Sequence, residues 1–449
     1  MKNAPAFRVI RMSDLCNRCK GKGLCGRPFC PILARFRKAG KIAGSLENAT
    51  EVFGPSPPAV FVGSYNYPDL SAGPLIPPAV DPEVIFSDAS EALRKKAEKG
   101  PSFLEDSREW HDLSMQDIIT MRSSLVRANS HFRPTDALPD TLAGSRRTSA
   151  VPDHKPKNPL LVKAQELALS AKPVDTEAWF RKPLIPELRF DSLMMPMGPS
   201  GQVRDFRITE SPKVPKKVDY LVYDTDASAK DVVLELFNGN VSSEQITRLM
   251  SIGLLGRERR LVPTRWSITA VDDMEGKALI SRIRDYPHLR DIMVFSGNFM
   301  GNYFEILLLP GSFSYEMLEL WMPQAVWSGD RTIIAQDAED FYGKKEYSTL
   351  TGGYYAARLP ILEYLEKIRR QAFVFVLREI RPEYCAPLGV WVVREASRIS
   401  MDNPHETFRT KEDALDAMAK RIITPRKDWE AATKKLHDQK IQSRLDSFF

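Results

Sequence analysis

The stretch Ile292-Met-Val-Phe-Ser-Gly-Asn-Phe-Met-Gly-Asn-Tyr-Phe-Glu-Ile-Leu-Leu-Leu309 holds two apolar runs separated by a glycine-containing turn. Short runs rich in Val, Ile, Phe and Tyr, bounded by Gly and Asn, are typical of β-strands. We therefore expect strands at Ile292–Phe295 and Tyr303–Leu309, joined by a turn at Gly297–Gly301. The body of the protein should contain this hairpin.

Other strand patterns lie on both sides of the hairpin. Phe373–Arg378 and Gly389–Arg394 are expected to form a second pair of strands. Apolar and polar residues alternate in Val218–Tyr223 and again in Trp266–Val271, which predicts a half-buried strand at each place.

Helices are expected between and before these strands. A helical pattern covers Ile361–Gln371, and Pro360 should set its start because proline is favoured in the first helical turn. Ser242 with Gln245 suits a capping box for a helix that runs to about Ile252. Three more helices are expected, at Ala89–Lys99, Met115–Ala128 and Leu160–Ala171. The predicted fold class is a mixed α/β or α+β body.

The chain has 449 residues and a formal charge of +6, and 43% of its residues are hydrophobic, as in ordinary folded proteins. Its charge is uneven, because residues 1–42 hold eleven Lys or Arg and one acid, Asp14. So concentrated an excess favours an anion-binding face, with nucleic acid as the expected partner, although a merely solvated patch would have the same composition. The expected phosphate contacts are Arg35, Arg37 and Lys38.

Neither a membrane span nor a signal peptide is expected, because the apolar runs are too short and the N-terminus lacks an apolar core. Four of the five cysteines lie between Cys16 and Cys30, whereas a disulfide scaffold would spread its cysteines along the chain. This distribution indicates a reducing, cytoplasmic environment.

The four clustered cysteines have the spacing of a metal site. Cys16, Cys19, Cys25 and Cys30 form a C-x2-C-x5-C-x4-C pattern, and four thiolates close a tetrahedral Zn²⁺ site. Such a site is structural, because it leaves no open coordination position. An iron–sulfur cluster and four free thiols are the alternatives, but the ligand spacings familiar for clusters differ from this one.

The last eight residues carry a second motif. Gln442, Leu445 and Phe448 recur every three residues, so one 3₁₀ turn places them on a single face, and Phe449 adds a second ring. This pattern resembles the sliding-clamp-binding (PIP) motif of replication and repair proteins. The resemblance implies that the DNA polymerase sliding clamp, PCNA, is the partner. The alternative is that the two rings fold back onto the protein's own core.

The body offers weaker candidates. If Asp272 and Asp273 follow a strand, they would be placed to hold Mg²⁺ or Mn²⁺ while Arg265 meets a phosphate. A strand-end turn with ordinary ion pairs would explain the same residues.

Exposed aromatic residues would provide stacking surfaces for bases. Tyr65, Tyr67 and Trp266 are the candidates, although burial in the core is the commoner outcome for such side chains.

The combination of an N-terminal four-cysteine segment with a C-terminal clamp motif resembles the archaeal Nre family of DNA-repair proteins. Three body segments support the resemblance: Val62-Gly-Ser-Tyr-Asn-Tyr-Pro68, Pro263-Thr-Arg-Trp-Ser-Ile-Thr269 and Gly297-Asn-Phe-Met-Gly-Asn302. The family implies a role in DNA-damage repair and binding to the sliding clamp, and it implies no catalytic residue.

On this basis the chain divides into four parts. We expect a basic zinc module at 1–42, an Nre-like N-terminal region at 43–310 with a mobile loop at 133–159, an Nre-like C-terminal region at 311–425, and a flexible helical tail at 426–449.

The leading hypothesis is a repair factor that the clamp recruits to DNA. A metal-dependent nuclease or nucleotide-processing enzyme that uses Asp272 and Asp273 is the alternative, and a zinc-containing RNA-binding protein is a third hypothesis.

Overall fold

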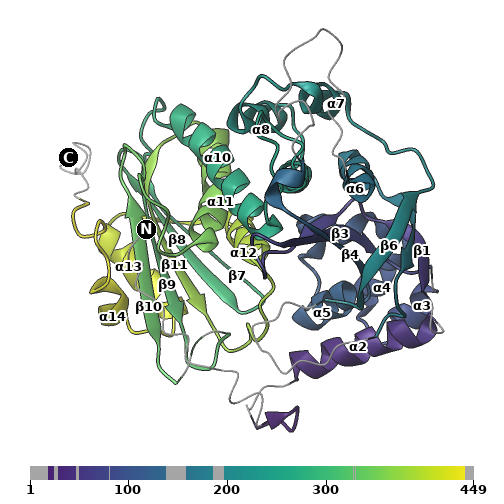
Figure 1. Ribbon diagram of the computed structural model, residues 1–449. Helices are drawn as coiled ribbons and strands as arrows, with labels where there is room; N and C mark the ends of the chain where they lie inside the picture. The colour runs from purple at the N-terminus through teal and green to yellow at the C-terminus, as the bar shows by residue number, and fades with distance from the viewer. Residues whose placement is uncertain are drawn as a thin grey trace, which may run out of the picture. The chain divides into compact units, whose positions relative to one another are not determined.

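The computed structural model describes residues 19–24, 29–46, 50–79, 81–137, 158–185, 197–326, 328 and 330–439 (Figure 1). The chain forms two compact units, and each is described by itself. The N-terminal unit contains Phe29–Arg189 and Pro196–Glu275, and the C-terminal unit is built mainly from Gly276 onward. The boundary at Glu275 falls within the long helix α10, Thr264–Ile283, so each unit holds one part of that helix.

The N-terminal unit contains a six-stranded sheet in the order β1-β5-β6-β4-β3-β2, in which only the β4–β6 pair is parallel. Burial alternates along β5, as expected when one face of a sheet packs on the core and the other faces outward. Its strands are β1 (Glu51–Ser56), β2 (Val60–Val62), β3 (Leu70–Ile76), β4 (Val126–Phe132), β5 (Val174–Phe180) and β6 (Ser200–Ile208).

Most helices of this unit begin at a residue whose side chain caps the first turn. Ser114 and Asp117 form a reciprocal capping box at the start of α5, and the Ser242 hydroxyl accepts a hydrogen bond from the Gln245 amide at the start of α9. The helices are α2 (Pro31–Ser45), α3 (Pro82–Ile85), α4 (Glu91–Glu98), α5 (Met115–Ser123), α6 (Pro159–Leu169), α7 (Lys216–Tyr223), α8 (Ala229–Asn238) and α9 (Ser243–Ser251).

The C-terminal unit contains a second six-stranded sheet, in the order β10-β9-β11-β8-β7-β12. Strands β9 and β11 pair in parallel and the other neighbours are antiparallel. The strands are β7 (Ile292–Phe299), β8 (Asn302–Pro310), β9 (Ser314–Trp321), β10 (Ile333–Glu339), β11 (Ala372–Ile380) and β12 (Glu406–Phe408).

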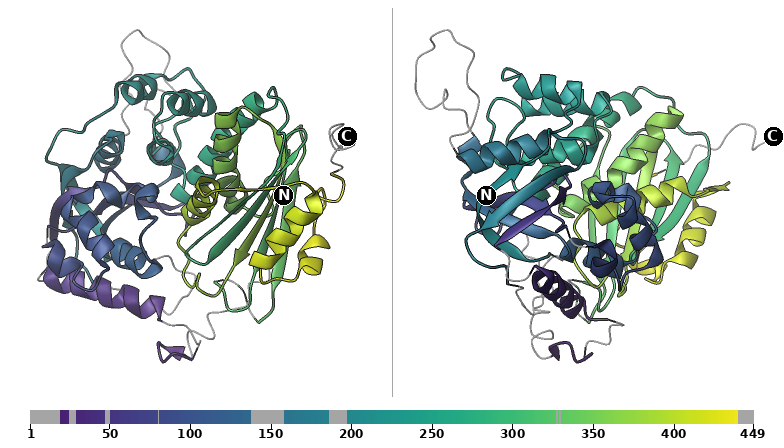
Figure 2. Two further views of the ribbon diagram at one scale, coloured as in Figure 1. Left: turned by 180° about the vertical axis from the view of Figure 1, so that it is seen from behind. Right: turned by 90° about the vertical axis from the view of Figure 1, so that its right-hand side faces the viewer.

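Helices cover both faces of this second sheet. Figures 1 and 2 show α11 and α12 on one face and α13 and α14 on the other. The bounds are α11 (Gly352–Ile368), α12 (Trp391–Asp402), α13 (Lys411–Arg421) and α14 (Arg426–Glu430). Because both faces are covered, β11 is buried at every position, which explains its unbroken apolar run.

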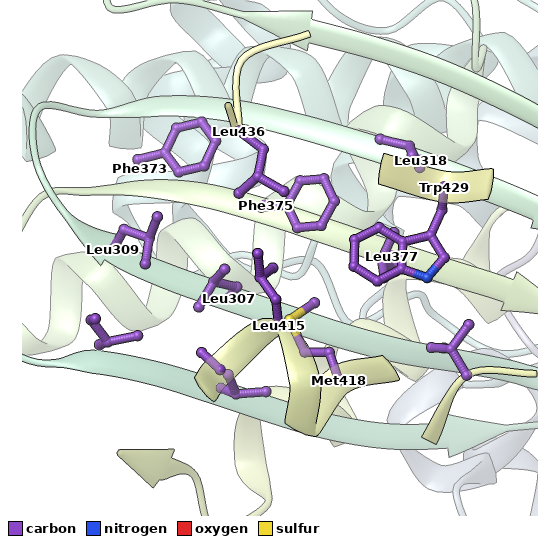
Figure 3. Packing of buried hydrophobic residues seen from close by; sticks show 14 of the residues in the cluster. Leu307, Leu309, Leu318, Phe373, Phe375, Leu377, Leu415, Met418, Trp429 and Leu436 are labelled. Carbon is purple, nitrogen blue, oxygen red and sulfur yellow. The ribbon is translucent and has the colours of Figure 1, made fainter. Parts of the chain in front are cut away.

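The core beneath α13 and α14 holds the C-terminal end of the described chain in place. Leu415 and Met418 of α13 lie over Phe375 and Leu377 of β11, and Trp429 completes the layer (Figure 3). The Trp429 ring lies 6.1 Å from the ring of Phe375, measured between centroids. Residues 426–439 are therefore part of the body, which corrects the prediction of a flexible helical tail beginning at 426.

Three predicted strands are helices. Val218–Tyr223 lies in α7, Trp266–Val271 in α10, and Gly389–Arg394 runs into α12. In α7 the buried residues are Val218, Leu221 and Val222, which have the i, i+3, i+4 spacing of a helix face. Within six residues this helical spacing resembles the alternation of a strand, which explains why the sequence pattern predicted a strand.

The helix expected at Ile361–Gln371 is present but begins earlier. In α11 the chain is already helical from Gly352, and Pro360 lies inside the helix instead of at its start.

The other predicted elements are present. The β7–β8 hairpin forms, but its turn is limited to Met300 and Gly301 in the left-handed backbone region, because β7 continues to Phe299, and β11 spans the expected strand. Helices α4, α6 and α9 lie where they were expected to within a few residues, whereas α5 ends at Ser123 and the last residues of the helix expected at Met115–Ala128 lie in strand β4. Of the predicted loop at 133–159, residues 138–157 lie outside the described residues, and its ends contain a 3₁₀ turn at Pro134–Ala137 and the start of α6. No helix among the described residues is long and apolar enough to cross a lipid bilayer.

Truncating the central indole of this core should destabilise the C-terminal unit. Trp429→Ala removes a side chain that is fully buried, so we expect the free energy of unfolding to fall by about 3–5 kcal/mol. Urea denaturation followed by circular dichroism measures the change. Tyr342→Ala is the matched control, because Tyr342 is 89% exposed and should cost little. An unchanged midpoint for Trp429→Ala would contradict this account of the core.

Candidate nucleic-acid interface

The loop between β2 and β3 presents two tyrosines to solvent. Tyr65 is 94% exposed and Tyr67 is 53% exposed. The loop is closed at its base by the Gly63 amide, which donates to the Ser71 carbonyl at 2.7 Å, and at its tip by the Asp69 amide, which donates to the Asn66 carbonyl at 2.8 Å. These backbone hydrogen bonds hold the two rings outside the core.

The first turn of α10 lies against this loop. The Val62 amide donates to the Thr264 hydroxyl oxygen at 2.9 Å, which joins two segments that are about 200 residues apart. Two residues further on, the Trp266 ring meets the Tyr67 ring with 5.1 Å between centroids and a tilt of 56°. The Arg265 guanidinium lies 5.9 Å from the centre of the same indole. We call Tyr65, Tyr67, Arg265 and Trp266 the aromatic corner.

Tyr65, Tyr67 and Trp266 are therefore exposed, whereas burial in the core was the commoner expectation for such residues. Trp266, in the first turn of α10, is 41% exposed. Exposed rings with an adjacent cation have the chemistry of a surface that stacks on bases.

Sequence reasoning missed the residue beneath the corner, Arg127 on β4. The Arg127 guanidinium lies 4.0 Å from the centre of the Phe61 ring and donates from Nη1 to the sulfur of Met197 at 3.0 Å. A Cβ atom at Gly63 would lie 3.3 Å from Nη2, so this side chain reaches the base of the tyrosine loop. Burial lowers the pKa of Arg127 to about 10, which keeps it charged at neutral pH. The only sequence signal was one charge inside the apolar run Leu125-Val-Arg-Ala128.

Asp272 and Asp273 do not lie at the end of a strand. Both lie within α10, where neighbouring side chains point about 100° apart around the axis, so the two carboxylates do not converge on one ion. Asp272 is fully buried, whereas a catalytic metal ligand must face the substrate. Within the described ranges no group of three or more His, Cys, Asp or Glu residues is arranged to hold a metal. The geometry thus removes the basis for the Mg²⁺ or Mn²⁺ site with Arg265.

Two of the three candidate basic side chains of helix α2 are buried inside the protein. Arg35 and Lys38 are 5% and 3% exposed, and the Lys38 ammonium pairs with the Asp88 carboxylate at 2.8 Å and also donates to the Ile85 carbonyl. Burial lowers the pKa of Lys38, against the opposing effect of Asp88. Arg35 therefore lies inside the fold, and the Lys38 ammonium is already engaged by an internal carboxylate and a carbonyl, which corrects their assignment as direct phosphate contacts. Arg37 is exposed and stays a predicted contact.

The cysteine motif is only partly within the described chain. Cys19 is buried and Cys30, which directly precedes α2, is half-buried. Cys16 and Cys25 lie outside the described residues, so the four-cysteine zinc site stays a prediction.

The segment that precedes the clamp motif is held by one buried carboxylate. Glu316, the third residue of β9, accepts hydrogen bonds from the backbone amides of Lys434, Lys435 and Leu436, the last two at 3.0 and 2.9 Å. The Leu436 side chain is buried in the core, and the Lys411 ammonium donates to the Gln439 carbonyl at 3.0 Å. The motif residues Gln442, Leu445, Phe448 and Phe449 lie outside the described residues.

Family models match almost the whole chain. The model described as archaeal Nre, N-terminal, matches residues 24–328, and the model described as archaeal Nre, C-terminal, matches residues 339–448. The chain belongs to the archaeal Nre family. The boundary between the two models falls near β10, whereas the two compact units of this Nre-family chain divide within α10.

Its relatives are DNA repair proteins. The chain is 36% identical to DNA repair protein NreA of Archaeoglobus fulgidus over 440 residues, which cover 98% of this chain and 99% of the relative. It is 34% identical to NreB of the same organism (89% and 91% covered) and 32% identical to NreA of Haloferax volcanii (81% of each). No solved structure matches the chain. This Nre-family chain is therefore a DNA repair protein.

The contacts of Lys38 predict a structural role for it in this Nre-family protein. Lys38→Met keeps the aliphatic stem but leaves the Ile85 carbonyl and Asp88 without their donor, so we expect unfolding to require about 1–3 kcal/mol less free energy. Thermal or urea denaturation measures this, with Arg37→Gln as the exposed control. Unchanged stability in Lys38→Met would return Lys38 to the set of surface cations.

Proposed function

We propose that this Nre-family DNA repair protein is recruited to DNA by the polymerase sliding clamp, PCNA, through Gln442, Leu445, Phe448 and Phe449. The observation that supports it is the anchor at Glu316, which fixes the chain as far as Leu436. From Gln439 to Gln442 an extended chain spans at most about 10 Å, so the motif follows its anchor directly. The described core around Trp429 and Leu436 is formed by residues that precede the motif.

The expected affinity for the clamp is moderate. Burial of Leu445, Phe448 and Phe449 gains roughly 5–9 kcal/mol, and ordering about eight residues costs a similar amount. The remaining hydrogen bonds then leave an affinity of about micromolar strength, which suits reversible recruitment.

Removing the two terminal rings should abolish clamp binding. For the full chain carrying Phe448→Ala and Phe449→Ala we expect a loss of about 100-fold or more in affinity for the sliding clamp, measured by isothermal titration calorimetry. Ser443→Ala is the matched control, because the motif leaves that position unspecified. Unchanged thermal stability would show that the rings are not core residues, and clamp binding retained by the double variant would refute the proposal.

We also propose that Cys16, Cys19, Cys25 and Cys30 hold one structural Zn²⁺ and that the basic segment around them, with Arg37, contacts DNA phosphates. The position of Cys30 directly before α2 supports this, because a metal there would fix the start of the basic helix.

Metal analysis tests the zinc proposal. We expect one zinc per chain by elemental analysis and a loss of most of it in Cys19→Ser and in Cys30→Ser, because three thiolates bind far more weakly than four. Cys385→Ser is the matched control, since Cys385 is buried in the C-terminal unit. Iron with a visible absorption band in the purified protein would favour a cluster instead.

A further inference from the structure

Arg127 differs from three other buried arginines of this protein, Arg248, Arg358 and Arg378. Arg248 pairs with Glu105, Arg358 with Glu339, and Arg378 with Glu319. By contrast, the Arg127 contacts within the described residues are the Phe61 ring and the Met197 sulfur, and its Nε has no hydrogen-bond partner there. Arg127 is 9% exposed and stays charged at neutral pH.

A buried cation with no oxygen acceptor is costly in a folded protein. Buried arginine side chains normally donate hydrogen bonds to carboxylates or carbonyls, because a guanidinium carries five donors and loses its hydration on burial. A thioether sulfur is a weak acceptor and does not neutralise the charge. The arrangement becomes favourable when an anion supplied from outside completes it, and a phosphate matches the forked geometry of a guanidinium.

The contacts connect Arg127 to the aromatic corner. Arg127 reaches Gly63, the neighbouring Val62 amide is bound by Thr264, and the helical turn that starts at Thr264 carries Arg265 and Trp266. Gly63 matters because a side chain there would meet Nη2 at 3.3 Å and the Ser71 carbonyl oxygen at 3.4 Å. The bare backbone at this position leaves room beside the guanidinium.

We propose that Arg127 and the aromatic corner form a nucleotide-binding site for single-stranded DNA, in which Arg127 binds a backbone phosphate and the Tyr67–Trp266 pair, with Arg265 beside it, stacks on a base. This inference rests on the proposed recruitment to DNA for its choice of ligand. An exposed ring can stack only on a base whose face is not covered by neighbouring bases. Such bases occur in single strands and not within a duplex. The phosphate subsite then secures the strand beside the stacked base.

Fluorescence anisotropy with the full chain and a labelled oligo-dT tests the proposal. The oligonucleotide has about 12 nucleotides, which lies within the size range of single-strand binding sites. We expect Trp266→Ala and Arg127→Gln each to weaken binding about tenfold or more. Tyr220→Ala and Arg94→Gln are the matched controls, because Tyr220 is 70% exposed and Arg94 is exposed, both outside the corner. Both controls should bind as the unaltered protein does.

A stability measurement separates loss of the ligand site from loss of the fold. Without DNA, Arg127→Gln should unfold at the same temperature as the unaltered protein or higher, because the substitution removes an unmatched buried charge. Saturating oligo-dT should raise the unfolding temperature of the unaltered protein but not that of Arg127→Gln. A lower unfolding temperature for Arg127→Gln without DNA would mean that the guanidinium is a structural element, and it would overturn the phosphate subsite.

Three further results would overturn the proposal. Unchanged oligo-dT binding in both variants would exclude the site, and equal or tighter binding of duplex DNA would exclude the single-strand preference. Competition by oligo-rU at equal or lower concentration would replace DNA with RNA as the ligand. The clamp proposal fails separately, because Phe448→Ala with Phe449→Ala should lose the clamp but keep oligo-dT, whereas Arg127→Gln should lose oligo-dT but keep the clamp.

Discussion

The Glu316 carboxylate links strand β9 of the C-terminal sheet to the last described segment of the chain. A carboxylate buried against a sheet is tolerated only when donors surround it, and three consecutive backbone amides meet this need with help from the Gln336 side-chain amide at 2.8 Å. The dependence is mutual, since the amides of Lys434–Leu436 have no strand or helix partner of their own there. Leu436 and Trp429 then seal the same region from water. The clamp motif therefore follows a fixed point, and the proposed recruitment depends on that point.

The N-terminal unit shows the opposite arrangement, because several of its polar and aromatic side chains contribute little to the packing of the core. The loop of Tyr65 and Tyr67 is closed by backbone hydrogen bonds, so its rings remain outside without loss of backbone pairing. Arg127 is buried beside Phe61, and no carboxylate of the described residues pairs with its guanidinium. A fold selected for stability alone would replace such a group with an apolar one, so its presence indicates a requirement other than stability.

Local signals predicted those elements in which neighbours along the chain decide the structure. The β7–β8 turn was predictable from the Gly and Asn residues between two apolar runs, of which Gly301 takes the positive φ, and α9 was predictable from Ser242 and Gln245. The strands predicted at Val218 and Trp266 failed because tertiary burial follows a helical period there. At the candidate site, the sequence offered an exposed Trp266 as one of two possibilities. The contact between the Trp266 and Tyr67 rings depends on the hydrogen bond from Val62 to Thr264, which no local sequence pattern encodes. The same limit explains Lys38, whose partner Asp88 is 50 residues away.

The two proposed sites complement each other energetically. The clamp motif is expected to bind at about micromolar strength, and a single-strand site with one stacked base is weak as well. Because both proposed sites belong to one chain, binding of the first partner would make the second event intramolecular and would raise its effective concentration. A clamp-bound molecule would then engage a single strand exposed near the clamp, while a free molecule at low concentration would not. If both proposals hold, moderate affinity at each site would confine the repair protein to places where clamp and unpaired DNA occur together, and it would allow release once the duplex is restored.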